Sequence, residues 1–118
     1  MQLSASYKQT SIEEIRNDFI VKKVKEIVRR YDTNAEIILF GSRARNDWNK
    51  ESDWDFLILS ELDEQNTVKE KIREDILEQI EHKTFDVVFT VFHNKKIWEK
   101  DYSVTPLYYN IQDEGIIV

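Results

Sequence analysis

The 118-residue sequence is poor in the residues that mark several common functional sites. It contains two glycines, one proline and no cysteine, whereas an average globular content of roughly 7% Gly would give about eight glycines. A dinucleotide-binding fingerprint needs three clustered glycines and a Walker A loop needs two, but Gly41 and Gly115 lie far apart in the chain. Without cysteine, the chain cannot form a disulfide framework, a zinc–cysteine cluster or a thiol nucleophile.

Long apolar runs and an excess of positive charge are also missing. No apolar run approaches the ~20 residues of a membrane span, and the N-terminal MQLSASYKQT lacks the apolar core of a signal peptide. We therefore expect a cytoplasmic protein with no direct membrane contact. The net charge of −6 at pH 7 makes nucleic acid an unlikely partner. The basic run VKKVKEIVRR (21–30) is interpreted as the end of a helix, where the helix dipole favours positive charge.

Helical periodicity alternates with short apolar runs, which predicts an α+β fold in a single domain over residues 1–118. Capping-box patterns at Ser11–Glu14 and Thr67–Glu70 each mark the start of a helix. The predicted elements, in chain order, are a helix over 11–31, a strand over 35–40, a short helix over 42–46, a strand over 54–59, a helix after Thr67, a strand over 85–92, a helix over 95–102 and a last helix before Gly115. Residues 1–10 are expected to be a flexible or edge segment. The strands are apolar on both faces, so we expect helices on both sides of the sheet.

Three acidic residues lie in or beside strands that otherwise have the composition of a core. Asp53 and Asp55 are two residues apart, so their side chains point to one face, and Asp86 lies near the start of the third strand. Unpaired buried carboxylates are costly, and oxygen ligands favour a hard cation such as Mg²⁺ or Mn²⁺. We therefore predict a metal site formed by all three. The alternative is that they are solvent-facing strand ends or form salt bridges to Arg43 or Arg45.

The dipeptide Gly41–Ser42 directly follows the first predicted strand. Glycine permits a sharp turn and a close approach of the backbone to a ligand, and the N–H groups of the following short helix, with the Ser42 hydroxyl, suit phosphate. Residues 43–52 separate this dipeptide from Asp53. The spacing therefore predicts a phosphate-binding turn and an acidic pair on neighbouring strands.

The segment GSRARNDWNKESDWDF (41–56) resembles the signature of the minimal nucleotidyltransferases of the DNA polymerase β superfamily, which is Gly-Ser, a ten-residue gap and Asp-x-Asp. Asp86 in TFDVVF stands where that family has a third Asp, and PLYYNIQDEGIIV resembles its C-terminal segment. Asn46 replaces the usual Gly, and we expect it to keep the left-handed turn. Trp54 and Phe56 are bulkier than usual and are expected to face away from the metal. The resemblance implies the nucleotidyltransferase fold, a small mixed sheet of three core strands and a candidate edge strand, flanked by helices.

The resemblance also implies a reaction, in which AMP moves from ATP to a hydroxyl group with the help of two Mg²⁺ ions, or Mn²⁺ as the alternative. Asp53 and Asp55 would bind the ions and the triphosphate. Asp86 would bind the ion beside the acceptor hydroxyl and take its proton.

The residues around the Gly-Ser turn have predicted roles in binding the nucleotide. Gly41 and Ser42 would hold the terminal phosphates, and Arg43 or Arg45 would offset phosphate charge, with a salt bridge to a nearby acid as the alternative for each arginine. Trp48 either stacks on a base, meets a partner or packs against its own loop.

The resemblance finally implies a partner. Minimal members of the family are typically paired with a small helical HEPN protein, an RNase toxin, and some transfer AMP to a toxin tyrosine. We therefore expect an antitoxin that uses ATP and Mg²⁺ and forms a hetero-oligomer, or a homo-oligomer if a second copy is the acceptor. The competing prediction is a binding module that neutralises the toxin by occlusion. A phospho-acceptor receiver domain is disfavoured, because its doubly wound pattern needs five strands, whereas this sequence opens with a helix and predicts three strands.

Overall fold

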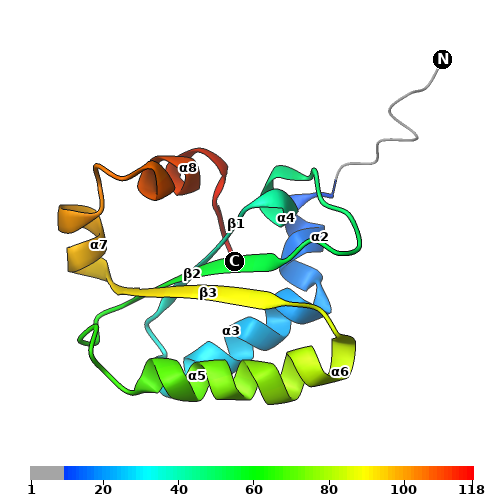
Figure 1. Ribbon diagram of the computed structural model, residues 1–118, viewed down its shortest axis with the longest axis horizontal. Coiled ribbons are helices and arrows are strands. Elements are labelled where there is room, and N and C mark those ends of the chain that lie inside the picture. Colours follow the sequence, from blue (N-terminus) through cyan, green and yellow to red (C-terminus); the bar gives the residue numbers. More distant parts are fainter. Residues whose placement is uncertain (1–9) are drawn as a thin grey trace.

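The computed structural model describes residues 10–118, which form a mixed four-stranded sheet with helices on both faces (Figure 1). The predicted flexible or edge segment lies outside the described residues, apart from Thr10. The elements are α2 (Ile12–Asn17), α3 (Phe19–Tyr31), β1 (Glu36–Phe40), α4 (Ser42–Arg45), β2 (Trp54–Ser60), α5 (Val68–Ile76), the π-helix η1 (Leu77–Glu81), α6 (His82–Thr84), β3 (Val88–Asn94), α7 (Lys95–Asp101), α8 (Pro106–Glu114) and β4 (Ile116–Ile117). No helix within residues 10–118 is long and apolar enough to cross a membrane.

The strand order is β3-β2-β1-β4. β1 runs antiparallel to both of its neighbours, β2 and β4, whereas β2 and β3 are parallel. The connection from β2 to β3 passes through the long helical segment α5–η1–α6, as a parallel pair requires. The α+β class and the mixed sheet of three core strands with an edge strand are confirmed, and the structure places that edge strand at β4, near the C-terminus.

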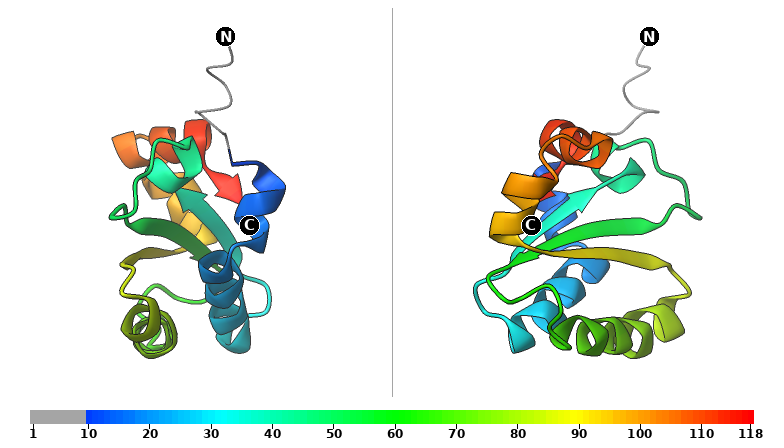
Figure 2. Two further views of the ribbon diagram at one scale, coloured as in Figure 1. Left: turned by 90° about the vertical axis from the view of Figure 1, so that its right-hand side faces the viewer. Right: turned by 60° about the vertical axis from the view of Figure 1, so that its left-hand side comes forward.

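Helices cover both faces of the sheet (Figure 2). Side chains of β2 contribute to the cores on both faces. Trp54, Phe56 and Ile58 belong to the core on the side of α3 and α5. Leu57 and Leu59 belong to the smaller core beneath α7 and α8. Because side chains alternate along a strand, Asp53 and Asp55 lie on the α7–α8 side, away from Trp54 and Phe56 as predicted.

The predicted helix over 11–31 is two helices. Ser11 caps the first as expected, since its Oγ accepts the Glu14 N–H at 3.0 Å. At Asp18 the backbone is extended, with φ −62° and ψ 142°, and its side chain accepts the Ile20 N–H at 2.8 Å. Asp18 therefore ends α2 and caps α3, because an aspartate side chain can satisfy the free N–H groups at the start of a new helix.

The second half of the chain departs from the prediction around residues 67 and 85. Thr67 makes no side-chain cap, and Asn66 accepts the Val68 N–H instead, at 2.7 Å. The helical segment runs on through η1 and α6 to Thr84, and Phe85 ends it in a left-handed conformation with φ 63°. β3 consequently begins at Val88, three residues later than predicted.

Candidate active site

The turn at Gly41 joins β1 to α4 and has a backbone conformation that other residues avoid. Its φ of 77° and ψ of −162° fall in a region that is essentially restricted to glycine. An added Cβ would lie 2.3 Å from Oδ2 of Asp55, which sits opposite Phe40 in the β1–β2 register. The structure thus places the Asp55 carboxylate directly against the backbone of the Gly41 turn.

Asp53 and Asp55 form a pair of neighbouring carboxylates. Asp53 immediately precedes β2 and is exposed, whereas Asp55 is partly buried within it. Burial raises the pKa of Asp55, the charges of Asp53 and Glu114 raise it further, and Arg45 opposes them. The negative charge of ionised Asp55 is therefore not fully balanced by the positive charge of Arg45. Mg²⁺ is commonly held by one or two carboxylates together with water and substrate phosphates, so the donor set of this pair fits such an ion.

Asp86 does not join this pair. It lies in the loop between α6 and β3, where its charge acts on Arg43 rather than on Asp55. In β3, Val88 packs into the α3–α5 core, and Phe89 is the residue opposite Asp55. Within residues 10–118, no three acidic, histidine or cysteine residues lie close enough to hold one metal ion. Among the described residues the predicted cluster of three carboxylates is therefore not formed, because Asp86 lies outside β3, in the loop that follows α6.

A residue that the sequence did not single out, Glu114, reaches the Gly41 turn from the end of α8. Its Oε2 accepts the Gly41 N–H at 2.6 Å and lies 3.1 Å from Nη1 of Arg45. Arg45 also contacts Asp47 through Nε at 3.1 Å, and both acids raise its pKa. The salt-bridge alternative for Arg45 thus describes this structure. The Glu114 carboxylate therefore accepts the hydrogen bond of the Gly41 backbone N–H, which was predicted to bind phosphate.

The other residues of the motif stabilise the turn and the loop that follows it. Ser42 is the first residue of α4, and its carbonyl oxygen accepts the N–H groups of Asn46 and of Asp47. Asn46 adopts the expected left-handed conformation, with φ 67° and ψ 28°. Arg43 is buried and lies beneath the ring of Trp48. Trp48 therefore packs on Arg43 of α4 in this structure, and Arg43 does not face the two carboxylates.

The family model of the nucleotidyltransferase domain matches residues 21–118, which include the Gly41 turn and both carboxylates. The chain belongs to this family. No curated protein matches it in a direct sequence comparison. Membership assigns the chain a nucleotidyl-transfer activity in general terms, and nucleotidyltransferases generally use nucleoside triphosphates and divalent metal ions.

In this nucleotidyltransferase, the sheet face that carries the carboxylates is covered at one end only. Leu57 and Leu59 are buried beneath α7 and α8, whereas Val87 and Phe89, next to the carboxylates, are each 52% exposed. The open end therefore combines two acids with an apolar surface, and a substrate can approach it without displacing a helix.

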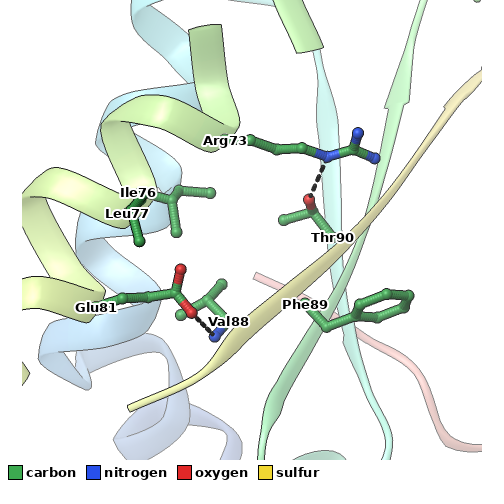
Figure 3. A pocket seen from close by; sticks show the side chains of 7 residues that line it. All are labelled: Arg73, Ile76, Leu77, Glu81, Val88, Phe89 and Thr90. Atoms are coloured by element: carbon green, nitrogen blue, oxygen red, sulfur yellow. Dashed lines mark hydrogen bonds between the residues drawn. The ribbon is translucent and has the colours of Figure 1, made fainter. Parts of the chain in front are cut away.

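A separate hollow of about 350 Å³ lies along the free edge of β3, between this strand and the helical segment α5–η1 (Figure 3). Glu81 accepts the Val88 N–H at 3.0 Å, and Nε of Arg73 donates to the Thr90 hydroxyl at 3.4 Å. Val88 and Thr90 point toward the α3–α5 side of the sheet, so this hollow is not the site that Asp55 faces. In this nucleotidyltransferase the hollow is the place where Arg73 and Glu81, from the helical segment, cover the edge of β3.

Proposed function

We propose that this nucleotidyltransferase transfers AMP from ATP to a hydroxyl group of a separate protein. The observation that carries the proposal is the packing of Asp55 against the Gly41 turn, at the end of the sheet that helices leave open. This arrangement offers phosphate a close approach to the backbone beside a pair of carboxylates. The choice of AMP and of a protein acceptor rests on the resemblance of the Gly-Ser and Asp-x-Asp motif to minimal nucleotidyltransferases.

Asp53 and Asp55 would hold Mg²⁺, with Mn²⁺ as a substitute. A bound ion would neutralise charge on the phosphates and on the attacking and leaving oxygens. Gly41 keeps space open beside Asp55, since a larger residue would place a Cβ where the carboxylate lies. Arg45, exposed at the rim of this site, carries a positive charge that can shift from Glu114 to phosphate.

The proposed acceptor is a HEPN-type toxin, which would make this chain the antitoxin of a toxin–antitoxin pair. The exposed side chains of Val87 and Phe89 beside the carboxylates support a protein acceptor, because they offer apolar contact area where the acceptor hydroxyl must arrive. Asp86 is not assigned the acceptor's proton, since it lies toward Arg43.

The test is to mix the chain with its cognate HEPN-type protein, Mg²⁺ and ATP labelled on the α-phosphate. We expect Mg²⁺-dependent label on the partner, and its loss in Asp53→Asn and Asp55→Asn. Asp101→Asn, which removes the same charge from the exposed end of α7, should label like the wild type. No label on a folded cognate partner would refute the proposal, and label on the chain itself would identify a second copy as the acceptor.

A second candidate is a binding module that neutralises the HEPN partner by occlusion without transferring AMP. Phe89 opposite Asp55 favours this alternative, because the acid predicted from the sequence does not complete the site. The same variants separate the two functions. Neutralisation of the partner's RNase activity that persists in the Asp53→Asn, Asp55→Asn double variant supports occlusion, whereas its loss supports catalysis.

A further inference from the structure

Arg43 is a buried arginine between two tryptophan rings, although the sequence suggested a role on the nucleotide. Its guanidinium carbon lies 4.4 Å from the ring centre of Trp48 and 4.4 Å from that of Trp54. The residue is only 8% exposed. Arginine is suited to such a position, because its planar and weakly hydrated guanidinium stacks on aromatic faces.

The same guanidinium holds the chain immediately before Asp53. Nη2 of Arg43 donates a hydrogen bond to the carbonyl oxygen of Ser52 at 3.1 Å. Ser52 also organises the loop, since its Oγ accepts the Asn49 N–H at 2.9 Å and its own N–H donates to the Asn49 carbonyl at 3.1 Å. Arg43 therefore links α4, the loop over 46–53 and the start of β2 at the residue before an active-site carboxylate.

The charges around Arg43 belong to the side of the sheet away from the proposed nucleotide site. Burial lowers its pKa, and the charges of Asp86 and Asp18 act against that effect. Trp54 packs into the α3–α5 core, whereas Asp53 and Asp55 lie on the α7–α8 side. A phosphate held at the carboxylates would thus be separated from the Arg43 guanidinium by the body of the strand.

We propose that Arg43 is a positioning residue, which sets the carboxylate of Asp53 for metal binding through the Ser52 carbonyl and the stacked tryptophans; this inference rests on the proposed function. Residues that orient the ligands of a metal ion typically change its affinity by about 10- to 100-fold. Removing the Arg43 contacts therefore weakens Mn²⁺ binding by roughly tenfold or more.

Two variants disturb the contacts from different sides. Arg43→Lys keeps the positive charge but loses the planar face and the fork of donors. Trp48→Leu removes the outer ring, which is 42% exposed, and leaves no large buried hole. Arg29→Lys, an exposed arginine in the last turn of α3, is the matched control.

The measurements are the affinity for Mn²⁺ by electron paramagnetic resonance without nucleotide, the rate of tryptic cleavage after Lys50 in the loop, and the melting temperature. We expect both variants to bind Mn²⁺ at least about tenfold more weakly and to be cut faster after Lys50, while Arg29→Lys matches the wild type. In the labelling assay, kcat should fall more than the KM for ATP rises.

Unchanged Mn²⁺ affinity and unchanged cleavage in both variants would overturn the proposal. So would a variant that loses ATP affinity but keeps Mn²⁺ affinity, because Arg43 would then act on the nucleotide. If Arg43→Lys does not fold, Trp48→Leu decides alone. A folded wild type that binds neither Mn²⁺ nor Mn²⁺–ATP refutes the proposed function instead, and cleavage after Lys50 then decides whether Arg43 holds the loop.

Discussion

Replacing Gly41 with alanine should damage the active site far more than the fold. The alanine must adopt φ 77° and ψ −162°, and its Cβ would meet Oδ2 of Asp55 at 2.3 Å. Holding a non-glycine residue in such a region costs about 1–3 kcal/mol. For a domain of this size, roughly 4 °C of melting temperature corresponds to 1 kcal/mol, so we expect a decrease of roughly 4–12 °C.

The larger effect of Gly41→Ala is on the position of Asp55. Since two atoms cannot remain 2.3 Å apart without a bond, the carboxylate has to move away from the turn. We therefore expect ATP binding, measured by calorimetry in the presence of Mg²⁺, and AMP transfer to be lost at temperatures where the variant is still folded.

The control for stability is Val24→Ala, in a fully buried position of α3 on the other side of the sheet. Loss of two methyl groups from this core costs roughly 2 kcal/mol, which matches the strain at Gly41 without touching Asp55. A Gly41→Ala protein that binds ATP as well as Val24→Ala does would show that phosphate does not approach this turn, and would refute the site.

Three further predictions concern charged and hydrogen-bonded side chains. Glu114→Gln should tighten ATP binding about fivefold, since two like charges ~4 Å apart in water repel by about 1 kcal/mol; weaker binding in calorimetry would mean that Glu114 helps to hold the nucleotide. Asp55→Asn should raise the melting temperature of the metal-free protein at pH 7, because the pKa of Asp55 is raised by burial and by Asp53, so its ionisation costs stability once the pH exceeds its ordinary value. This gain should shrink as the pH falls toward 3.8, and an equal gain at both pH values would contradict the explanation. Tyr31→Phe should lower the melting temperature at neutral pH, because the Tyr31 hydroxyl donates to Asp75 at 2.5 Å and this bond raises the pKa of Tyr31 above 10.0. The advantage of the wild type should disappear as the pH rises through that raised pKa, where tyrosinate has no proton to donate.

The contact between the Gly41 turn and Asp55 could be predicted, because the two residues lie close together in the sequence. Gly41 ends one strand and Asp55 lies near the start of the next, so an antiparallel pairing of these two neighbours in sequence brings them together. The face on which Asp55 lies also follows from alternation, because Trp54 and Phe56 take the opposite face.

The position of Asp86 could not be derived in the same way. The segment FDVVFTVF (85–92) is apolar on both faces, so alternation does not say which face of the sheet Asp86 shares. A helical segment that continues to Thr84 and a left-handed Phe85 then shift the start of the strand. These features depend on how the π-helix packs, and no local pattern marks it.

Glu114 could not be found from sequence for a different reason. It meets Gly41 across 73 positions of the chain, and this contact depends on the pairing of β4 with β1, which carries α8 back to the turn. A strand of two residues has too short a sequence pattern to predict its pairing, and therefore too short to predict where Glu114 lies. The sequence therefore led to a carboxylate near Gly41, where the structure places Asp55, but it did not point to Glu114.

The contact between Glu81 and the Val88 N–H has a consequence for how the proposed partner would be recognised. An outward N–H that is already occupied is closed to a strand from another chain. At this position, recognition of the proposed partner would depend on side chains such as Phe89 rather than on backbone pairing, which is largely indifferent to sequence. If the chain acts as proposed, related pairs could diverge by substitutions of a few surface side chains and so avoid binding one another's partners, with the backbone of the sheet unchanged.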